Sequence, residues 1–199
     1  MGRLVTRRSV LGGTLAFVAS GCVPFRRSNS FGGKITTNYR VGDVALALAE
    51  PIYVAEARTY LVPFPPQSIE RAAKVYPPAL VAGMQLGVVA LYQKCTHLGC
   101  RVPWCSTSRW FECPCHAALF NRVGERKGGP APRGLDHFAV VIDGGKVVID
   151  SRQVFIGAAD GTNTTGQEAE GPHCVGSATG SVGSDGGANT PTLAPTTAA

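Results

Sequence analysis

The part of the sequence that decides the fold is a pair of short segments, Cys95-Thr96-His97-Leu98-Gly99-Cys100 and Cys113-Pro114-Cys115-His116. Each segment offers a thiolate and an imidazole a few residues apart. Two loops of this kind that meet at their tips would present two sulfurs and two nitrogens to a metal. Such a ligand set suits either zinc or a mixed-ligand [2Fe-2S] cluster.

The spacing within each segment separates these two possibilities. Zinc sites usually pair cysteine with cysteine across two to four residues and histidine with histidine across three to five. Here each loop mixes the two types, as C-x-H and as C-x-x-H. A two-iron cluster accommodates this mixture, because two cysteines can bind one iron while two histidines bind the other. The pattern therefore favours a [2Fe-2S] cluster.

At these residues the chain resembles the Rieske family, whose motifs C-T-H-L-G-C and C-P-C-H match here without a gap. The resemblance covers roughly residues 86–156. It implies that Cys95 and Cys113 bind an inner iron, and that His97 and His116 bind an outer, solvent-facing iron. It also implies that the two histidines face a quinol.

Two more cysteines lie inside the matched motifs. In Rieske subunits of quinol-oxidising complexes, the positions of Cys100 and Cys115 form a disulfide that clamps the two cluster loops, whereas Rieske oxygenases and their ferredoxins generally lack them. The resemblance therefore implies a Cys100–Cys115 disulfide and a subunit of the respiratory or photosynthetic type. An oxidising compartment would suit such a bridge. Outside the leader, only Cys105 and Cys174 then remain, and as a leftover even pair they are a candidate second disulfide.

A proline-rich segment follows the second motif. Residues 128–135 resemble the loop that covers the cluster in this family, with Gly129, Pro130 and Pro132 as its stiff elements. The expected role is an apolar lid that keeps water from the sulfurs and leaves the imidazole edges open. The alternative is an ordinary Pro/Gly turn.

The remaining residues of the 31–156 region are predicted to form short strands. With 25 glycines and 14 prolines, the composition favours turns and a β-rich fold. We expect an all-β, Rieske-type antiparallel β-sandwich over residues 31–156, with a small cluster-binding subdomain at about 92–135. A brief helix is predicted from Ser68, and a closing hairpin over 139–150 turns at Asp143-Gly144-Gly145.

Both ends of the chain differ from this body. Residues 1–30 form a twin-arginine-like signal or membrane anchor, because Arg7 and Arg8 precede a short apolar run. Cys22 lies in a lipoprotein-like box, so a lipid on it is the alternative tether. Either route predicts attachment to the outer face of a bacterial cytoplasmic membrane. Residues 157–199 are rich in Gly, Ser and Thr and are predicted to be a mobile tail.

The charge of the chain argues against nucleic acid. The formal net charge is +6, but five of the basic residues lie before residue 28, which leaves the body near neutrality. Clustered Lys and Arg with interleaved aromatics, which mark a surface that follows phosphates, are missing from the body. We therefore expect no nucleic-acid partner.

The resemblance implies one-electron transfer from a membrane quinol to a c-type cytochrome, next to a cytochrome b-type membrane subunit. Three positions depart from quinol-oxidising subunits: Ala117 and Ala118 replace the usual Gly-Ser, and Phe120 stands where Tyr is frequent. This departure keeps open a second interpretation, the small Rieske subunit of an arsenite-oxidase-like molybdoenzyme. A third interpretation, of another class, is an exported metal-binding protein without redox function.

Overall fold

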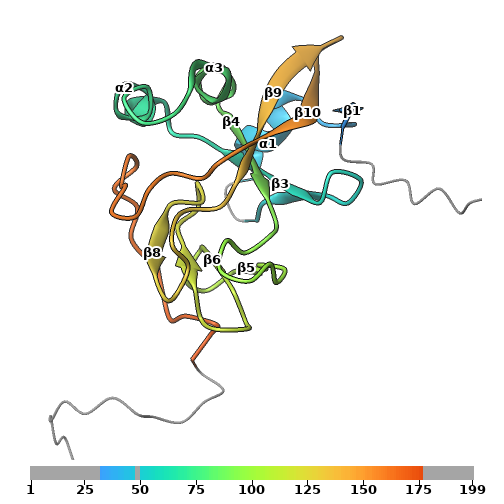
Figure 1. Cartoon of the computed structure of the whole chain (residues 1–199). Coiled ribbons are helices and arrows are strands. Elements are labelled where there is room, and N and C mark those ends of the chain that lie inside the picture. Colours follow the sequence, from blue (N-terminus) through green and yellow to red (C-terminus); the bar gives the residue numbers. More distant parts are fainter. Residues whose placement is uncertain (1–31, 48–49, 177–199) are drawn as a thin grey trace, which may run out of the picture.

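The computed structural model describes residues 32–47 and 50–176, which form two antiparallel sheets and a few short helices (Figure 1). The all-β class predicted from the sequence is confirmed. The predicted leader over residues 1–30, including Cys22, lies outside the described residues. Within the described part, no helix combines the length and the apolar character needed to cross a bilayer.

The larger sheet has six strands. In spatial order they are β1 (Lys34–Thr36), β10 (Lys146–Phe155), β9 (His137–Asp143), β4 (Val88–Tyr92), β3 (Thr59–Pro63) and β2 (Ile52–Val54). Strands β9 and β10 form the predicted hairpin, in which Asp143 pairs with Lys146. Between them Gly144 and Gly145 have φ angles of +54° and +76°, as a two-residue turn of the type I′ kind requires.

The smaller sheet is built by the chain that leaves β4 and returns at β9. It has four strands in the order β5 (Trp104–Cys105), β6 (Trp110–Glu112), β7 (Leu119–Phe120) and β8 (Arg126–Gly128). Both cysteine–histidine motifs belong to this excursion of the chain. The smaller sheet thus lies in the region that the sequence assigns to the cluster.

Apolar side chains cover both faces of the larger sheet. Along β4, Val89 and Leu91 point to one hydrophobic cluster while Val88 and Ala90 point to the other, which is the alternation expected of a strand. The first of these clusters also contains residues of the smaller sheet. The ring of Phe111, for example, lies 4.9 Å from that of a tyrosine in β3. This shared core joins the two sheets and fixes the base on which the motifs stand.

Helices cover part of this core and are more numerous than the sequence suggested. The helix expected from Ser68 is present as a 3₁₀ turn, Pro66–Ser68, followed by α2 (Ile69–Ala72). Two further helices, α1 (Val41–Leu46) and α3 (Pro78–Gln85), stand where only strands were expected. Pro78 opens α3, a position at which proline's missing N–H costs nothing.

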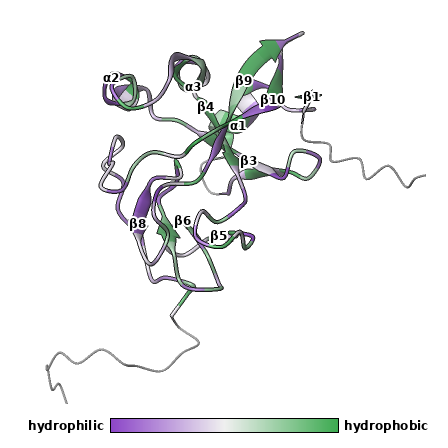
Figure 2. Cartoon of the chain, viewed as in Figure 1, coloured by the Kyte–Doolittle hydropathy of each residue, from purple (hydrophilic) through white to green (hydrophobic). Residues whose placement is uncertain are grey.

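The C-terminal part of the described chain departs from the prediction of a mobile tail. Residues 157–176 run along the smaller sheet, next to the hydrophilic strand β8, which is purple in Figure 2. Thr164 is buried and its N–H donates to Glu125 at 2.8 Å, and Glu170 pairs with Arg122 at 2.9 Å. Polar contacts hold this segment, and its composition, poor in large apolar residues, could not reveal them. Residues 177–199 lie outside the described part.

Candidate functional site

The first motif forms a closed hydrogen-bonded loop. The Cys95 N–H donates to the Cys100 carbonyl at 2.8 Å, and the Gly99 N–H donates back to the Cys95 carbonyl at 2.9 Å. Gly99 has a φ of +84°, in the left-handed region that glycine adopts without steric cost. The loop therefore turns its middle residues, including His97, outward from a fixed base.

The second motif has the same frame. The Cys113 N–H donates to the Ala118 carbonyl at 2.9 Å, and the Ala117 N–H donates to the Cys113 carbonyl at 3.0 Å. Ala117 occupies the place of Gly99, with a φ of +53°. Two loops far apart in the sequence thus share one backbone design, and each holds a cysteine at its start.

The donor atoms divide into a buried pair and a more exposed pair. Cys95 and Cys113 carry free thiols and are 2% and 1% exposed. The rings of His97 and His116 lie with their centroids 4.8 Å apart, edge to face. Nδ1 of His97 is buried and has no hydrogen-bond partner among the described residues. Two buried thiols and a buried imidazole nitrogen without a partner, carried by two linked loops, are a donor set that fits iron.

The Cys95 thiol has a raised pKa. Burial raises the pKa of the Cys95 thiol, and the neighbouring Cys113 thiol raises it further, while backbone N–H groups of His97 and Leu98 oppose the shift. A buried thiol that resists ionisation in this way is stabilised as thiolate when a cation replaces its proton. A bound cation would therefore stabilise the thiolate form of this buried cysteine.

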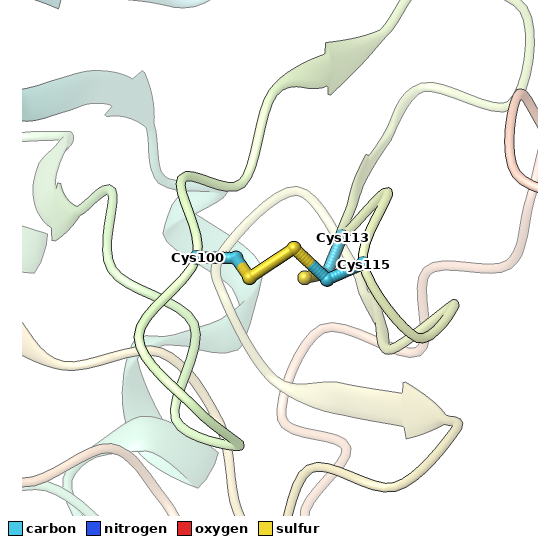
Figure 3. Close-up of side chains that lie close together, drawn as sticks. All are labelled: Cys100, Cys113 and Cys115. Atoms are coloured by element: carbon cyan, nitrogen blue, oxygen red, sulfur yellow. A yellow bond between two sulfur atoms is a disulfide. The ribbon is translucent and has the colours of Figure 1, made fainter.

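A disulfide joins the two loops. Cys100 is bridged to Cys115, as the resemblance implied, and the Cys113 sulfur lies beside the bridge (Figure 3). Because each partner belongs to a different motif, the bridge prevents the loops from separating. The loop tips that carry the two histidines are held together covalently.

The predicted lid contacts both loops. A Cβ placed on Gly129 would lie 2.4 Å from the Ala117 carbonyl oxygen, so the lid backbone packs directly on the second loop. The hydroxyl of Thr96 donates to the Arg133 carbonyl at 2.9 Å, which attaches the lid to the first loop. Between these points Ala131 is buried. Pro130 and Pro132, which were expected to form the stiff lid, flank Ala131 and are themselves exposed.

A second disulfide lies at the other end of the smaller sheet. Cys105 is bridged to Cys174, so the pairing suggested by counting cysteines is confirmed. The bridge fixes the end of the C-terminal segment. Sequence reasoning missed the residue that supports it, Glu112, which is 1% exposed and accepts hydrogen bonds from the backbone N–H groups of Cys174 and Val175 at 2.7 and 2.9 Å.

Glu112 remains charged despite its burial. Burial alone would raise the pKa of this carboxyl, but hydrogen bonds from Ser108, the Val175 N–H, His173 and the Cys174 N–H outweigh it and lower the pKa. The signal for this site was a glutamate inside the apolar run Trp110-Phe111-Glu112-Cys113. A charge at such a position calls for buried partners.

The other two histidines are not brought to the loops. His173 contacts Glu112 through Nδ1 at 2.7 Å. His137 is fully buried in β9, packs 5.4 Å from the Tyr76 ring, and has its pKa lowered to about 4 by burial. The Trp104 ring packs edge-on against the Phe111 ring, with the two centroids 5.1 Å apart.

Comparison with known proteins also points to an iron-sulfur site. Residues 66–139 match the Rieske [2Fe-2S] domain. The cytochrome b6-f complex iron-sulfur subunit of a Synechococcus species is 44% identical over 64 residues, which is 31% of this chain and 37% of the relative. The chloroplastic subunit of Bigelowiella natans is 43% identical over 67 residues, 34% of this chain and 27% of that protein. The matched stretch thus spans about a quarter to just over a third of these relatives' length.

Solved structures with related chains include the plasma membrane Rieske protein PetC3 of Synechocystis. It is 23% identical with a TM-score of 0.39, and the match covers 58% of this chain and 97% of that one. A chain of a hyperthermophilic respiratory Complex III is 24% identical with a TM-score of 0.41, covering 63% of this chain and 82% of that one. From the domain match, the two motif loops and their bridge, we conclude that this chain carries a Rieske domain, whose cofactor is a [2Fe-2S] cluster.

Proposed function

We propose that Cys95 and Cys113 bind the inner iron of the cluster and that His97 and His116 bind the outer iron. The observation that carries this assignment is the difference in burial between the two pairs. The cysteines are 1–2% exposed at the loop bases, whereas His116 is exposed at its loop tip. The orphaned Nδ1 of His97 supplies the third donor. In this proposal a ring nitrogen of His116 supplies the fourth.

The reaction is one-electron transfer from a membrane quinol to a c-type cytochrome. When bound, the cluster accepts the electron. Nε2 of His97 or of His116, the ring nitrogen that would not bind iron, accepts a hydrogen bond from a quinol hydroxyl and takes its proton. An imidazole bound to iron through its other nitrogen becomes more basic on reduction, which couples the proton to the electron.

The residues around the two histidines hold the rings in place and exclude water from the buried sulfurs. The Cys100–Cys115 bridge and the lid hold the two loops together, so both rings present one surface to the quinol. Burial of the cysteines excludes water from the sulfurs, which keeps the surroundings of the inner iron apolar. The exposed ring of His116 provides the route for both the proton and the electron.

The partner is a cytochrome b-type membrane subunit in a bc-type complex. Support comes from the relatives, which are iron-sulfur subunits of cytochrome b6-f complexes. The domain lies on the outer face of a bacterial cytoplasmic membrane, tethered by the N-terminal segment or by a lipid on Cys22. Two disulfides among the described residues agree with an oxidising compartment.

One observation favours a second candidate, the small subunit of an arsenite-oxidase-like molybdoenzyme. Ala118 and Phe120 are fully buried in the core that contains Cys95 and Cys113, and neither can donate a hydrogen bond to the cluster. Quinol-oxidising relatives usually have hydroxyl groups at both places. In this alternative the electron comes from a molybdenum subunit instead of quinol.

Isolation of the full chain from its native membranes tests these proposals. We expect a cytochrome b to co-purify and the preparation to reduce a c-type cytochrome with quinol. A Cys95→Ser chain is the matched control, because it keeps the partner surface but loses a proposed ligand, and it should lose the activity. Co-purification with a molybdopterin subunit would support the second candidate. A chain with stoichiometric zinc and no acid-labile sulfide would overturn both.

A further inference from the structure

A free thiol lies directly beside the bridge that clamps the loops. The sulfurs of Cys100, Cys113 and Cys115 all lie within 4.8 Å of one another, and Figure 3 shows Cys113 next to the Cys100–Cys115 bond. Cys113 is not itself in a disulfide. A thiolate and a disulfide at this distance are the two reactants of thiol–disulfide exchange.

The exchange needs no outside oxidant or reductant. Cys113 loses its proton and its sulfur attacks Cys100 Sγ. A Cys100–Cys113 bond forms, the Cys100–Cys115 bond breaks, and the electron pair of the broken bond goes to Cys115, which takes up a proton. Attack on Cys115 would instead close a ring across Pro114 alone, and the fixed φ of proline makes so short a bridge difficult. Cys115 is also exposed, so water can solvate the leaving sulfur.

We propose that Cys113, when it is not bound to iron, exchanges reversibly with the Cys100–Cys115 bridge, so that part of the metal-free chains carries a Cys100–Cys113 disulfide instead. A chain in this state lacks one of the four cluster ligands, so ligation of Cys113 protects the bridge from exchange. The consequence for the cluster rests on the ligand set proposed above. The exchange itself rests only on the positions of the three sulfurs.

The second disulfide provides an internal comparison. The third group close to Cys105 and Cys174 is the carboxylate of Glu112, which cannot exchange with a disulfide. Both bridges belong to the same folded domain and share the same solvent. Exchange confined to Cys100–Cys115 would therefore come from the position of Cys113, whereas scrambling of both would come from unfolding.

The test follows the disulfide pattern of the full chain by peptide mapping without reduction. The cluster-loaded chain is stripped anaerobically with an iron chelator, kept for several hours without added thiol, quenched with acid and alkylated. Uncatalysed disulfide rearrangement takes minutes to hours, so this time is sufficient. We expect a Cys100–Cys113 peptide and a newly alkylated Cys115 in on the order of half of the chains, as for two bridges of similar energy. A loaded sample kept equally long should retain Cys100–Cys115.

Two variants isolate the attacking thiol. Cys95→Ser removes the other free thiol of the described residues, so that Cys113 alone among them can attack the bridge, and it should show the Cys100–Cys113 peptide without any stripping. Cys113→Ser should keep Cys100–Cys115 intact under the same treatment. If Cys95→Ser fails to fold, the stripped wild type still tests the exchange.

The proposal is overturned if the stripped chain and Cys95→Ser both keep only Cys100–Cys115 with Cys113 alkylated, or if Cys105–Cys174 scrambles to the same extent. Failure of the proposed function is a separate result, because metal and sulfide analysis before stripping detects it. A chain found with zinc would still report on exchange once the zinc is removed.

Discussion

The two cluster loops use the same backbone frame but place different residues at its most demanding position. Each loop closes through one hydrogen bond from the first cysteine and one back to it, and in each the fifth residue has a positive φ. Gly99 fills this position in the first loop and Ala117 in the second. A non-glycine residue in the left-handed region costs roughly 1–2 kcal/mol. The same two hydrogen bonds therefore close both loops, and the second loop carries a conformational cost at Ala117 that glycine avoids in the first.

The lid also contacts the two loops in different ways. It attaches to the first loop by the hydroxyl of Thr96, and to the second by direct packing of Gly129 on the backbone of Ala117 and Ala118. The strained loop is thus the one that the lid covers most closely. Four sets of substitutions would test this comparison.

The largest expected effect is loss of the cluster when the histidine of either loop is replaced. We expect His97→Ala and His116→Ala to abolish the rhombic paramagnetic signal of the reduced protein, because each removes one of the two proposed ligands to the outer iron. The measurement is electron paramagnetic resonance together with acid-labile sulfide. His173→Gln, which changes a histidine outside the loops, should keep the signal. An unchanged signal in either loop variant would show that the ligand assignment is wrong.

The next effect concerns the lid on the second loop. Gly129→Ala should lower the free energy of unfolding by about 3 kcal/mol, because the new Cβ would meet backbone atoms and the residue has a φ of +78°. Gly161→Ala is a matched control with a φ of +80° and open space around it, and it should cost only about 1 kcal/mol. Urea unfolding of the disulfide-intact chain measures both. Equal costs would mean that the lid does not press on the second loop.

The third effect is on the reduction potential, which we expect in the lower part of the Rieske range of about −150 to +300 mV. Hydroxyl groups that donate to the cluster sulfurs stabilise the reduced form, and Ala118 and Phe120 supply none. If each restored bond contributes about 1 to 2 kcal/mol, Ala118→Ser and Phe120→Tyr should each raise the potential by about 40 to 90 mV.

Protein-film voltammetry measures these potentials. Ala90→Ser, a buried alanine in the other hydrophobic cluster, is the control and should leave the potential unchanged. A wild-type potential near the top of the range would mean that backbone amides and burial set it instead. A low potential would suit menaquinol better than ubiquinol as donor.

The smallest effect exchanges the residues at the shared position. Ala117→Gly should raise the free energy of unfolding by about 0.5–1 kcal/mol, because glycine removes the left-handed cost but adds chain entropy in the unfolded state. Gly99→Ala should lower it by about 1–2 kcal/mol. Its Cβ would also meet the flexible Lys94 side chain at 2.9 Å, which can move aside. Thermal unfolding of both variants checks the signs, and the same sign for both would mean that the frames are not equivalent.

Much of the site could be predicted because its information is local. The mixed C-x-H and C-x-x-H spacings indicated the cluster, and the Gly144-Gly145 pair indicated the hairpin, since both depend on a few neighbouring residues. The prediction of a mobile tail was wrong for residues 157–176 for the opposite reason. The order of these residues depends on partners far along the chain, such as Glu125 for Thr164. Composition carries no record of such partners.

The sequence by itself determined the kind of donors, their grouping into two loops, and the β-rich character of the domain, because these follow from residue type and short-range spacing. Only the tertiary structure decided that Cys95 and Cys113 are almost fully buried, that Glu112 is the anchor of residues 173–175, and that Cys113 lies beside the Cys100–Cys115 bridge. These properties arise where separate segments pack against each other. The distance between two such segments is set by the core that joins the sheets, to which residues throughout the chain contribute.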